Sequence, residues 1–157
     1  MLNAIKPAVI LGVGVILLST LTIATGMHTN VALQQALFLG AAIGMNVAVI
    51  IWALRGNAAE NGYAAQLGIS ALVGLIAGVI IFIGSYVLTT VVFPDALSET
   101  ADAMLPLLEQ AGMSEEQIDA RMAKMESPVS NALPGLIGTF VTSLVVGAVV
   151  AIFFRRK

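Results

Sequence analysis

Long uncharged stretches separated by short polar ones dominate the pattern along this chain. The longest stretch, 64–93, contains no Asp, Glu, Lys or Arg. At about 1.5 Å per residue, a helix of that length exceeds a hydrocarbon core of about 30 Å, so it is predicted to cross a membrane tilted or protruding. Three further stretches of spanning length lie at 7–26, 31–54 and 132–154. The pattern therefore predicts an all-α fold, a polytopic four-helix transmembrane bundle that forms one membrane domain over 1–157.

Local signals mark the ends of these spans. Pro7 and Pro134 suit the first turn of a helix, where the missing N–H costs no hydrogen bond. Trp52 and Arg55 lie at the end of the second span, where such residues anchor helices at the membrane interface. The first span also has features of a secretory signal, with one Lys before an apolar run. We interpret it as an uncleaved first transmembrane helix.

The segment 95–128 is the only long polar one, and it is predicted to form an amphipathic helical hairpin between the third and fourth spans. In its first half, apolar residues recur at helical spacing with carboxylates between them. These apolar residues are Leu97, Ala101, Met104, Leu108 and Ala111. Pro106 is expected to kink or divide this helix, and Gly112 to end it.

A second short helix of this hairpin is predicted to begin at Ser114, which forms a capping box with Gln117. Its end is expected at Ser127 and Pro128. The apolar faces of both helices need cover from each other, from the membrane surface or from a partner. The expected contact face consists of Leu97, Met104, Ile118 and Met122.

Composition agrees with a membrane protein. Of the 157 residues, 59% are hydrophobic and 10% are charged, whereas soluble domains are usually about a quarter charged. The chain has no Cys and one His, which excludes thiolate chemistry and multi-histidine metal sites. We expect no metal, no cofactor and no catalytic residues. Without a basic stripe, we also expect no nucleic acid partner.

The charges are segregated along the chain. Eight of the nine carboxylates and two of the seven Lys and Arg residues fall between Asp95 and Glu126. The other basic residues are Lys6, Arg55, Arg155, Arg156 and Lys157. Because short loops rich in Lys and Arg stay in the cytoplasm, both termini are predicted to be cytoplasmic and the acidic hairpin extracytoplasmic.

Two motifs connect the chain with a known family. The long third span ends in Phe93-Pro94-Asp95, and the hairpin contains the run Gly112-Met113-Ser114-Glu115-Glu116-Gln117-Ile118. With two closely spaced spans before them and a last span after, these motifs resemble the bacterial membrane family catalogued as domain of unknown function 4199. The resemblance covers nearly the whole chain. It implies the four-helix fold and a bacterial cytoplasmic (inner) membrane location, and it implies no activity.

Two G-x-x-x-G pairs are candidates for helix packing, Gly40 with Gly44 in the second span and Gly74 with Gly78 in the third. Rows of small residues let a second helix approach closely in lipid. The second helix belongs either to this bundle or to another subunit, and the sequence leaves both alternatives open.

Asn46 is the deepest strongly polar side chain of the second span. It is a possible intramembrane site for a substrate or an ion, but the favoured interpretation is a hydrogen bond to a neighbouring helix next to Gly44. Gln34 and Gln35 are expected near the headgroups.

Many Ser and Thr residues occur within the spans, and together they could line a polar path. The favoured interpretation is that each hydroxyl bonds to its own helix backbone four residues earlier. The set comprises Ser19, Thr20, Thr22, Thr25, Thr89, Thr90, Thr139, Thr142 and Ser143.

The titratable groups outside the spans have ordinary explanations. His28 lies in the turn after the first span, and we expect it to be a solvated loop residue rather than a pH sensor. Glu115, Glu116 and Asp119 could hold a cation weakly. We favour a role for them in complementing the dipole at the start of a helix.

Charged residues are absent from the spans, although proton-coupled transporters usually keep some there as relays. We therefore expect a non-enzymatic protein, an accessory or structural subunit that packs against a larger membrane complex or against itself. The expected partners are the lipid bilayer and a membrane protein or further copies of the chain. A small oligomeric channel or transporter lined by Asn46 is the alternative. An enzymatic role would need active residues from a partner chain.

Overall fold

The computed structural model describes residues 2–56 and 62–154, and nearly all of them are helical. Four helices are long and apolar enough to cross a membrane, which confirms the predicted number of spans. They are α1 (Leu2–Ala24), α2 (Val31–Arg55), α3 (Tyr63–Val87), which the short π-helix η2 (Leu88–Val92) extends, and α6 (Pro128–Phe154). The chain is therefore a multi-pass membrane protein with an all-α fold.

Two helices begin earlier than predicted, so Pro7 and Pro134 lie inside helices and not in their first turns. α1 begins at Leu2, and Pro7 lies within it. This extension is stabilised by packing, since Ala4 and Ala8 are buried in the core. α6 begins at Pro128, which occupies the favoured first helical position, so Pro134 lies well inside that helix.

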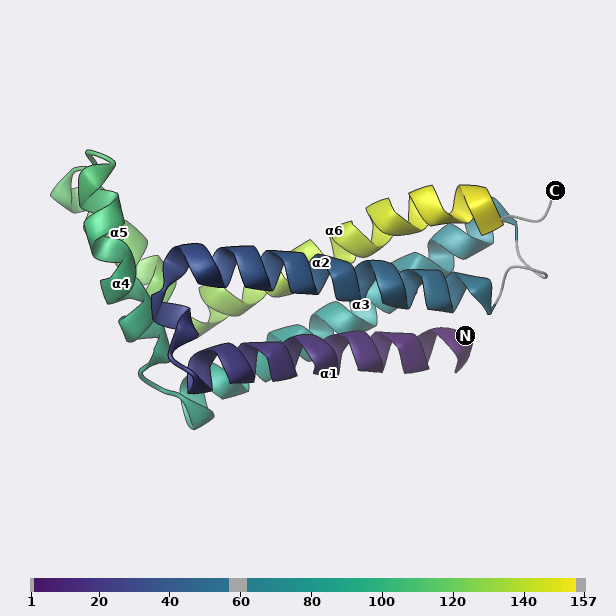
Figure 1. The fold of residues 1–157 in the computed structure, drawn as a ribbon, viewed down its shortest axis with the longest axis horizontal. Helices are drawn as coiled ribbons and strands as arrows, with labels where there is room; N and C mark the ends of the chain where they lie inside the picture. The colour runs from purple at the N-terminus through teal and green to yellow at the C-terminus, as the bar shows by residue number, and fades with distance from the viewer. Residues whose placement is uncertain (1, 57–61, 155–157) are drawn as a thin grey trace.

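The spans run side by side, with α1, α2, α6 and α3 following one another around the bundle (Figure 1). The most extensive contact joins α3 to α6, and the next joins α3 to α1. α2 makes smaller contacts with α1 and α6. The bundle is therefore built on α3, and α2 is its most loosely attached span.

Small residues bring α3 and α6 together. Gly78 lies against the backbone of Leu136, where an added Cβ would be 2.9 Å from the carbonyl oxygen. One turn earlier, Gly74 faces Phe140, whose Cα would be 3.1 Å from such a Cβ. Next along the row, Ser70 fits against Gly147 of α6. This row of small side chains at four-residue spacing allows an approach that larger residues would block.

Most members of the hydrophobic core lie in the half of the bundle nearer the described ends of the chain, and Val15 and Ile81 lie past the middle of α1 and α3. Its buried members come from all four spans: Ala4, Ala8, Leu11, Val15, Val49, Ile50, Ala53, Leu54, Val73, Ala77, Ile81 and Ala151. Gln66 extends the α3 row into this half, where its Nε2 donates to the carbonyl oxygen of Phe154 at 2.7 Å. That bond satisfies one of the carbonyls left free at the end of a helix.

Two shorter helices, α4 (Ala96–Gln110) and α5 (Glu115–Glu126), lie across the opposite end of the bundle (Figure 1). We call these two helices the cap. Pro106 does not divide α4, contrary to one of the two predicted outcomes. Gly112 ends it as predicted, with a φ of 72° that favours glycine. The predicted capping box of Ser114 and Gln117 opens α5.

Replacement of Gly78 by Ala tests the close approach of α3 to α6. The added Cβ would meet the Leu136 backbone, which cannot rotate away, so we expect the free energy of unfolding in detergent to fall by about 1–3 kcal/mol. Gly68→Ala is the matched control on the same helix, because nothing described lies within 4 Å of its added Cβ. Equal stability of the two variants would contradict this account of the interface.

Candidate functional site

Asn46 joins α2 to α6 inside the bundle. Its Nδ2 donates to Ser143 Oγ at 2.9 Å, and the two residues are 3% and 0% exposed. This is the interhelical hydrogen bond that the sequence favoured, although Gly44 faces away from it into open space. Asn46 Oδ1 is buried and has no hydrogen-bond partner among the described residues. A buried acceptor left unpaired costs about 1–3 kcal/mol.

A cavity of about 190 Å³ lies beside this asparagine, between α1, α2 and α6. Its walls are mostly apolar, and Asn46, Thr139 and Thr142 supply the polar groups. The apolar walls are formed by Leu11, Val15, Phe38, Leu39, Ala42, Ile43, Pro134 and Gly138. Leu39 and Ile43 are also exposed on the outer surface of the spans, so the cavity reaches the side of the bundle that faces lipid.

Most of the span hydroxyls bond to their own helix, as predicted. Ser19, Thr20, Thr25, Thr89 and Thr90 each donate to a carbonyl oxygen four residues earlier, at 2.7–3.0 Å. The α6 residues depart from this pattern. In the part of the chain that the structure describes, neither Thr139 nor Thr142 makes such a bond, and Ser143 accepts from Asn46. The hydroxyls of these two threonines are therefore available to a molecule in the cavity that they line.

Two further cavities with more polar linings continue from this one toward the cap. A second cavity of about 190 Å³ shares Phe38 with the first, and it is lined by Gln34, Thr89 and Asn131 among others. A third, of about 110 Å³, shares those three residues and reaches His28 beneath α4. The share of polar lining residues is thus larger in the two cavities toward the cap, whereas Leu11 and Val15 of the first cavity belong to the apolar core. No pattern in the sequence indicates that Asn131 lines a cavity.

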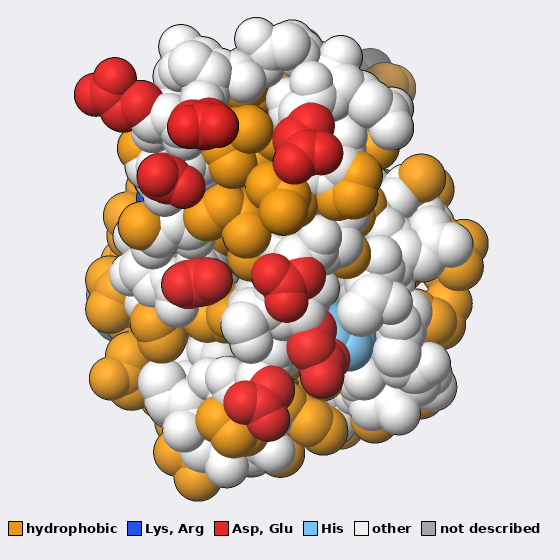
Figure 2. Space-filling view, turned by 90° about the vertical axis from the view of Figure 1, so that its left-hand side faces the viewer, with side chains coloured by type: hydrophobic (Ala, Val, Ile, Leu, Met, Phe, Trp, Pro, Cys, Tyr) orange, Lys and Arg blue, Asp and Glu red, His pale blue; other side chains and the backbone are white. Residues whose placement is uncertain are grey.

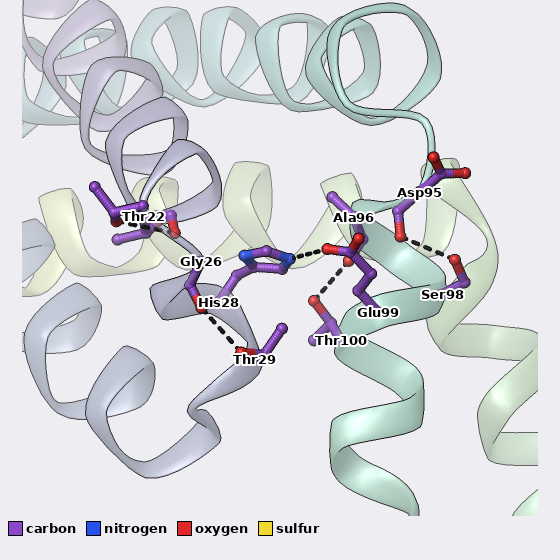
Figure 3. Close-up of polar contacts among 10 residues, drawn as sticks. Thr22, Gly26, His28, Thr29, Asp95, Ala96, Ser98, Glu99 and Thr100 are labelled. Carbon is purple, nitrogen blue, oxygen red and sulfur yellow. Dashed lines mark hydrogen bonds and ion pairs between the residues drawn. The ribbon is translucent and has the colours of Figure 1, made fainter.

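The expectation that His28 is a solvated loop residue is wrong. Its side chain lies on the 3₁₀ turn η1 (Met27–Thr29), is 4% exposed, and contacts Glu99 of α4. The Nε2–H donates to Glu99 Oε2 at 2.7 Å, which ties the turn between α1 and α2 to the cap (Figure 3). His28 Nδ1 has no partner within the described chain. The pair is 71 positions apart, so no local pattern could reveal it.

The two G-x-x-x-G pairs lie in different surroundings. Gly74 and Gly78 are buried against α6. Gly40 and Gly44 are exposed on α2, and no described atom comes within 4 Å of a Cβ added at either position. The first pair is therefore used inside the bundle, and the second pair is uncovered in the single chain.

The cap presents its carboxylates outward, with hydrophobic side chains between them (Figure 2). Within the proposed contact face, Leu97 is buried at 8% exposure, whereas Met104, Ile118 and Met122 are only partly covered. Glu115, Glu116 and Asp119 are exposed on the first turns of α5. Among the described residues, no three Asp, Glu or His side chains converge closely enough to hold a metal ion.

A comparison with models of protein families identifies the family of this chain. Residues 6–156 match the model described as protein of unknown function (DUF4199). The chain belongs to this family. The resemblance inferred from the Phe-Pro-Asp and Gly-Met-Ser-Glu-Glu-Gln motifs is thereby confirmed. No curated protein and no solved structure matches this DUF4199 protein.

Removal of the His28 imidazole tests the tie between η1 and α4 in this DUF4199 protein. A hydrogen bond to a charged group contributes about 1.5–3 kcal/mol, so His28→Ala should speed amide exchange in the first turns of α4 by roughly tenfold or more. Hydrogen exchange followed by mass spectrometry measures this. Glu109→Gln, which alters an exposed carboxylate near the end of α4, is the control. Unchanged exchange in His28→Ala would show that the contact does not hold the cap.

Proposed function

We propose that this DUF4199 protein is a non-enzymatic accessory or structural subunit, whose α2 packs against a transmembrane helix of a larger membrane complex or of a second copy. The observation that carries the proposal is an uncovered row of small residues on α2. Its members recur every fourth position and are all exposed: Ala32, Ala36, Gly40, Gly44 and Ala48. At 3.6 residues per turn, such positions form one shallow stripe along the helix.

The comparison between α2 and α3 supports this interpretation. On α3, the row of Ser70, Gly74 and Gly78 is filled by α6 of the same chain. On α2, a row of the same spacing has nothing described against Gly40 or Gly44. In lipid, close van der Waals packing along small residues is a main source of helix association. The α2 row therefore offers another helix the kind of surface that α3 offers α6.

The proposal includes an orientation in the bacterial cytoplasmic membrane. The cap carries most of the carboxylates of the chain, and it lies at the end of the bundle opposite Lys6 and Arg55 (Figures 1 and 2). Since Lys and Arg favour the cytoplasmic side, the termini would be cytoplasmic and the cap extracytoplasmic. The uncovered α2 row would then be offered within the membrane, and the acidic cap outside it.

Paired leucine substitutions in the α2 row test the docking proposal. Native mass spectrometry of the protein, gently extracted from its own membrane, should find a stoichiometric partner for the wild type. In Gly40→Leu/Gly44→Leu, the added side chains block close approach, and recovery of the partner should fall at least tenfold, or about 1.4 kcal/mol.

The control for this experiment is Gly68→Leu, since Gly68 is also an exposed glycine of a span with open space around it. It should retain the partner. A partner that proves to be the same chain would identify a homo-oligomer, and one that proves to be a larger assembly would identify an accessory subunit. Retention of the partner by every variant, or a bare monomer from the start, would overturn the proposal.

A small oligomeric channel or transporter is the second candidate, and the series of cavities from His28 to Asn46 favours it. Polar groups line the cavities nearest the cap, whereas apolar core residues pack the spans farther from the cap. A complete path across the membrane would therefore need surfaces from several copies. Asn46→Leu should then abolish solute flux in proteoliposomes while the oligomer persists. Flux equal to that of the wild type would eliminate Asn46 as a lining residue.

A further inference from the structure

The cavity beside Asn46 combines two features that point to a ligand. The first is a buried acceptor, Asn46 Oδ1, which makes no hydrogen bond within the described chain. The second is a pair of hydroxyls, on Thr139 and Thr142, that break the backbone-bonding habit of the other span hydroxyls described above. All three residues line the same cavity of about 190 Å³. Polar groups at membrane depth are costly to leave unpaired, so their convergence calls for an occupant.

The surroundings determine the charge of that occupant. The residues lining the cavity include no Asp, Glu, Lys, Arg or His. A charged group bound there would lack a counter-ion in a region of low dielectric constant, which is strongly unfavourable. The ligand should therefore be neutral.

The free polar atoms determine its hydrogen-bonding group. Asn46 Oδ1 can only accept, so the ligand must carry an O–H or N–H donor. The threonine hydroxyls can donate to an oxygen of the ligand. A hydroxyl group meets both requirements with one atom, because its hydrogen serves Asn46 while its lone pairs accept from Thr139 or Thr142. An ether or a hydrocarbon cannot satisfy Asn46 Oδ1.

The walls and the opening determine the rest of the molecule. Leu11, Val15 and Phe38 give the cavity an apolar interior. For comparison, an apolar cavity of about 150 Å³ in another protein binds benzene, so a volume of about 190 Å³ is suited to a ring or a short chain with one polar group. Leu39 and Ile43 connect the cavity with the lipid-facing surface, so a lipid-soluble molecule can enter sideways from the bilayer.

From these constraints we propose that the cavity beside Asn46, between α1, α2 and α6, binds a neutral, lipid-soluble alcohol or phenol. The hydroxyl of this ligand bonds to Asn46 and to Thr139 or Thr142. This site is independent of the docking row, because Asn46 lies two residues after Gly44 and therefore about 200° around the helix from it. The ligand enters this site from the membrane, and residues of two spans, α2 and α6, select for its hydroxyl group.

Phenol and toluene form a matched pair of probes, since they have a similar ring and differ in the hydroxyl. Alanine methyl NMR of the full chain in lipid nanodiscs follows the Ala42 methyl, which lines the cavity, while the Ala77 methyl in the core serves as the internal reference. Phenol should shift the Ala42 signal saturably, at a concentration roughly tenfold lower than toluene requires. Anisole, which has an oxygen but no donor, should behave like toluene.

Variants assign the effect to the named groups. Asn46→Leu and Thr142→Val should each reduce the preference for phenol over toluene, and the second keeps the shape of the side chain if the first fails to fold. Thr90→Val is the matched control, because its hydroxyl bonds to Tyr86 and lies outside the cavity. It should keep the wild-type preference.

Three results would overturn the inference. Equal binding of phenol and toluene would show a merely apolar cavity. Equal binding of phenol and anisole would show that no donor is required. The lack of any saturable Ala42 shift with phenol would show that water alone occupies the space.

Discussion

The close approach of α3 to α6 is the contact on which the rest of this membrane protein depends. A hydrophobic driving force between helices is missing in lipid, so association relies on van der Waals packing and hydrogen bonds. The row Ser70, Gly74 and Gly78 lets the two backbones come almost into contact, and Gln66 closes the end of α6 with a hydrogen bond to the Phe154 carbonyl. α1 packs against the same helix, α3, in the second most extensive contact between the spans.

α2 belongs to the bundle in a different way. Val49, Ile50 and Leu54 hold its second half in the apolar core, and Asn46 fastens its middle to Ser143. Cavities lie beside Phe38 and Asn46 on one side of α2. On the other side, the row of Gly40 and Gly44 is uncovered. Both functional proposals arise from this single loosely held span, one from each of its faces.

The cap depends on the bundle in turn. α5 buries none of its residues, and α4 buries Leu97, Ala101 and Leu108. The imidazole of His28 adds a polar tie from the turn between α1 and α2 to Glu99. Because α6 starts directly after Ser127, the cap is also joined by a very short connection to the span that lines the Asn46 cavity.

Hydropathy, charge and local capping chemistry determined much of this protein without any tertiary information. The four spans, the stop at Gly112 and the capping box at Ser114 all follow from interactions within a few residues, which a sequence displays directly. Pro7 and Pro134 suit a helix start by local rules, but packing of Ala4 and the favourable position of Pro128 extend both helices past them.

Only the tertiary structure decided which glycine pair is buried, that His28 meets Glu99, and that Thr139 and Thr142 share a cavity with Asn46. Each of these depends on how the helices rotate and cross, and a sequence in which every face of a span is apolar leaves that rotation undetermined.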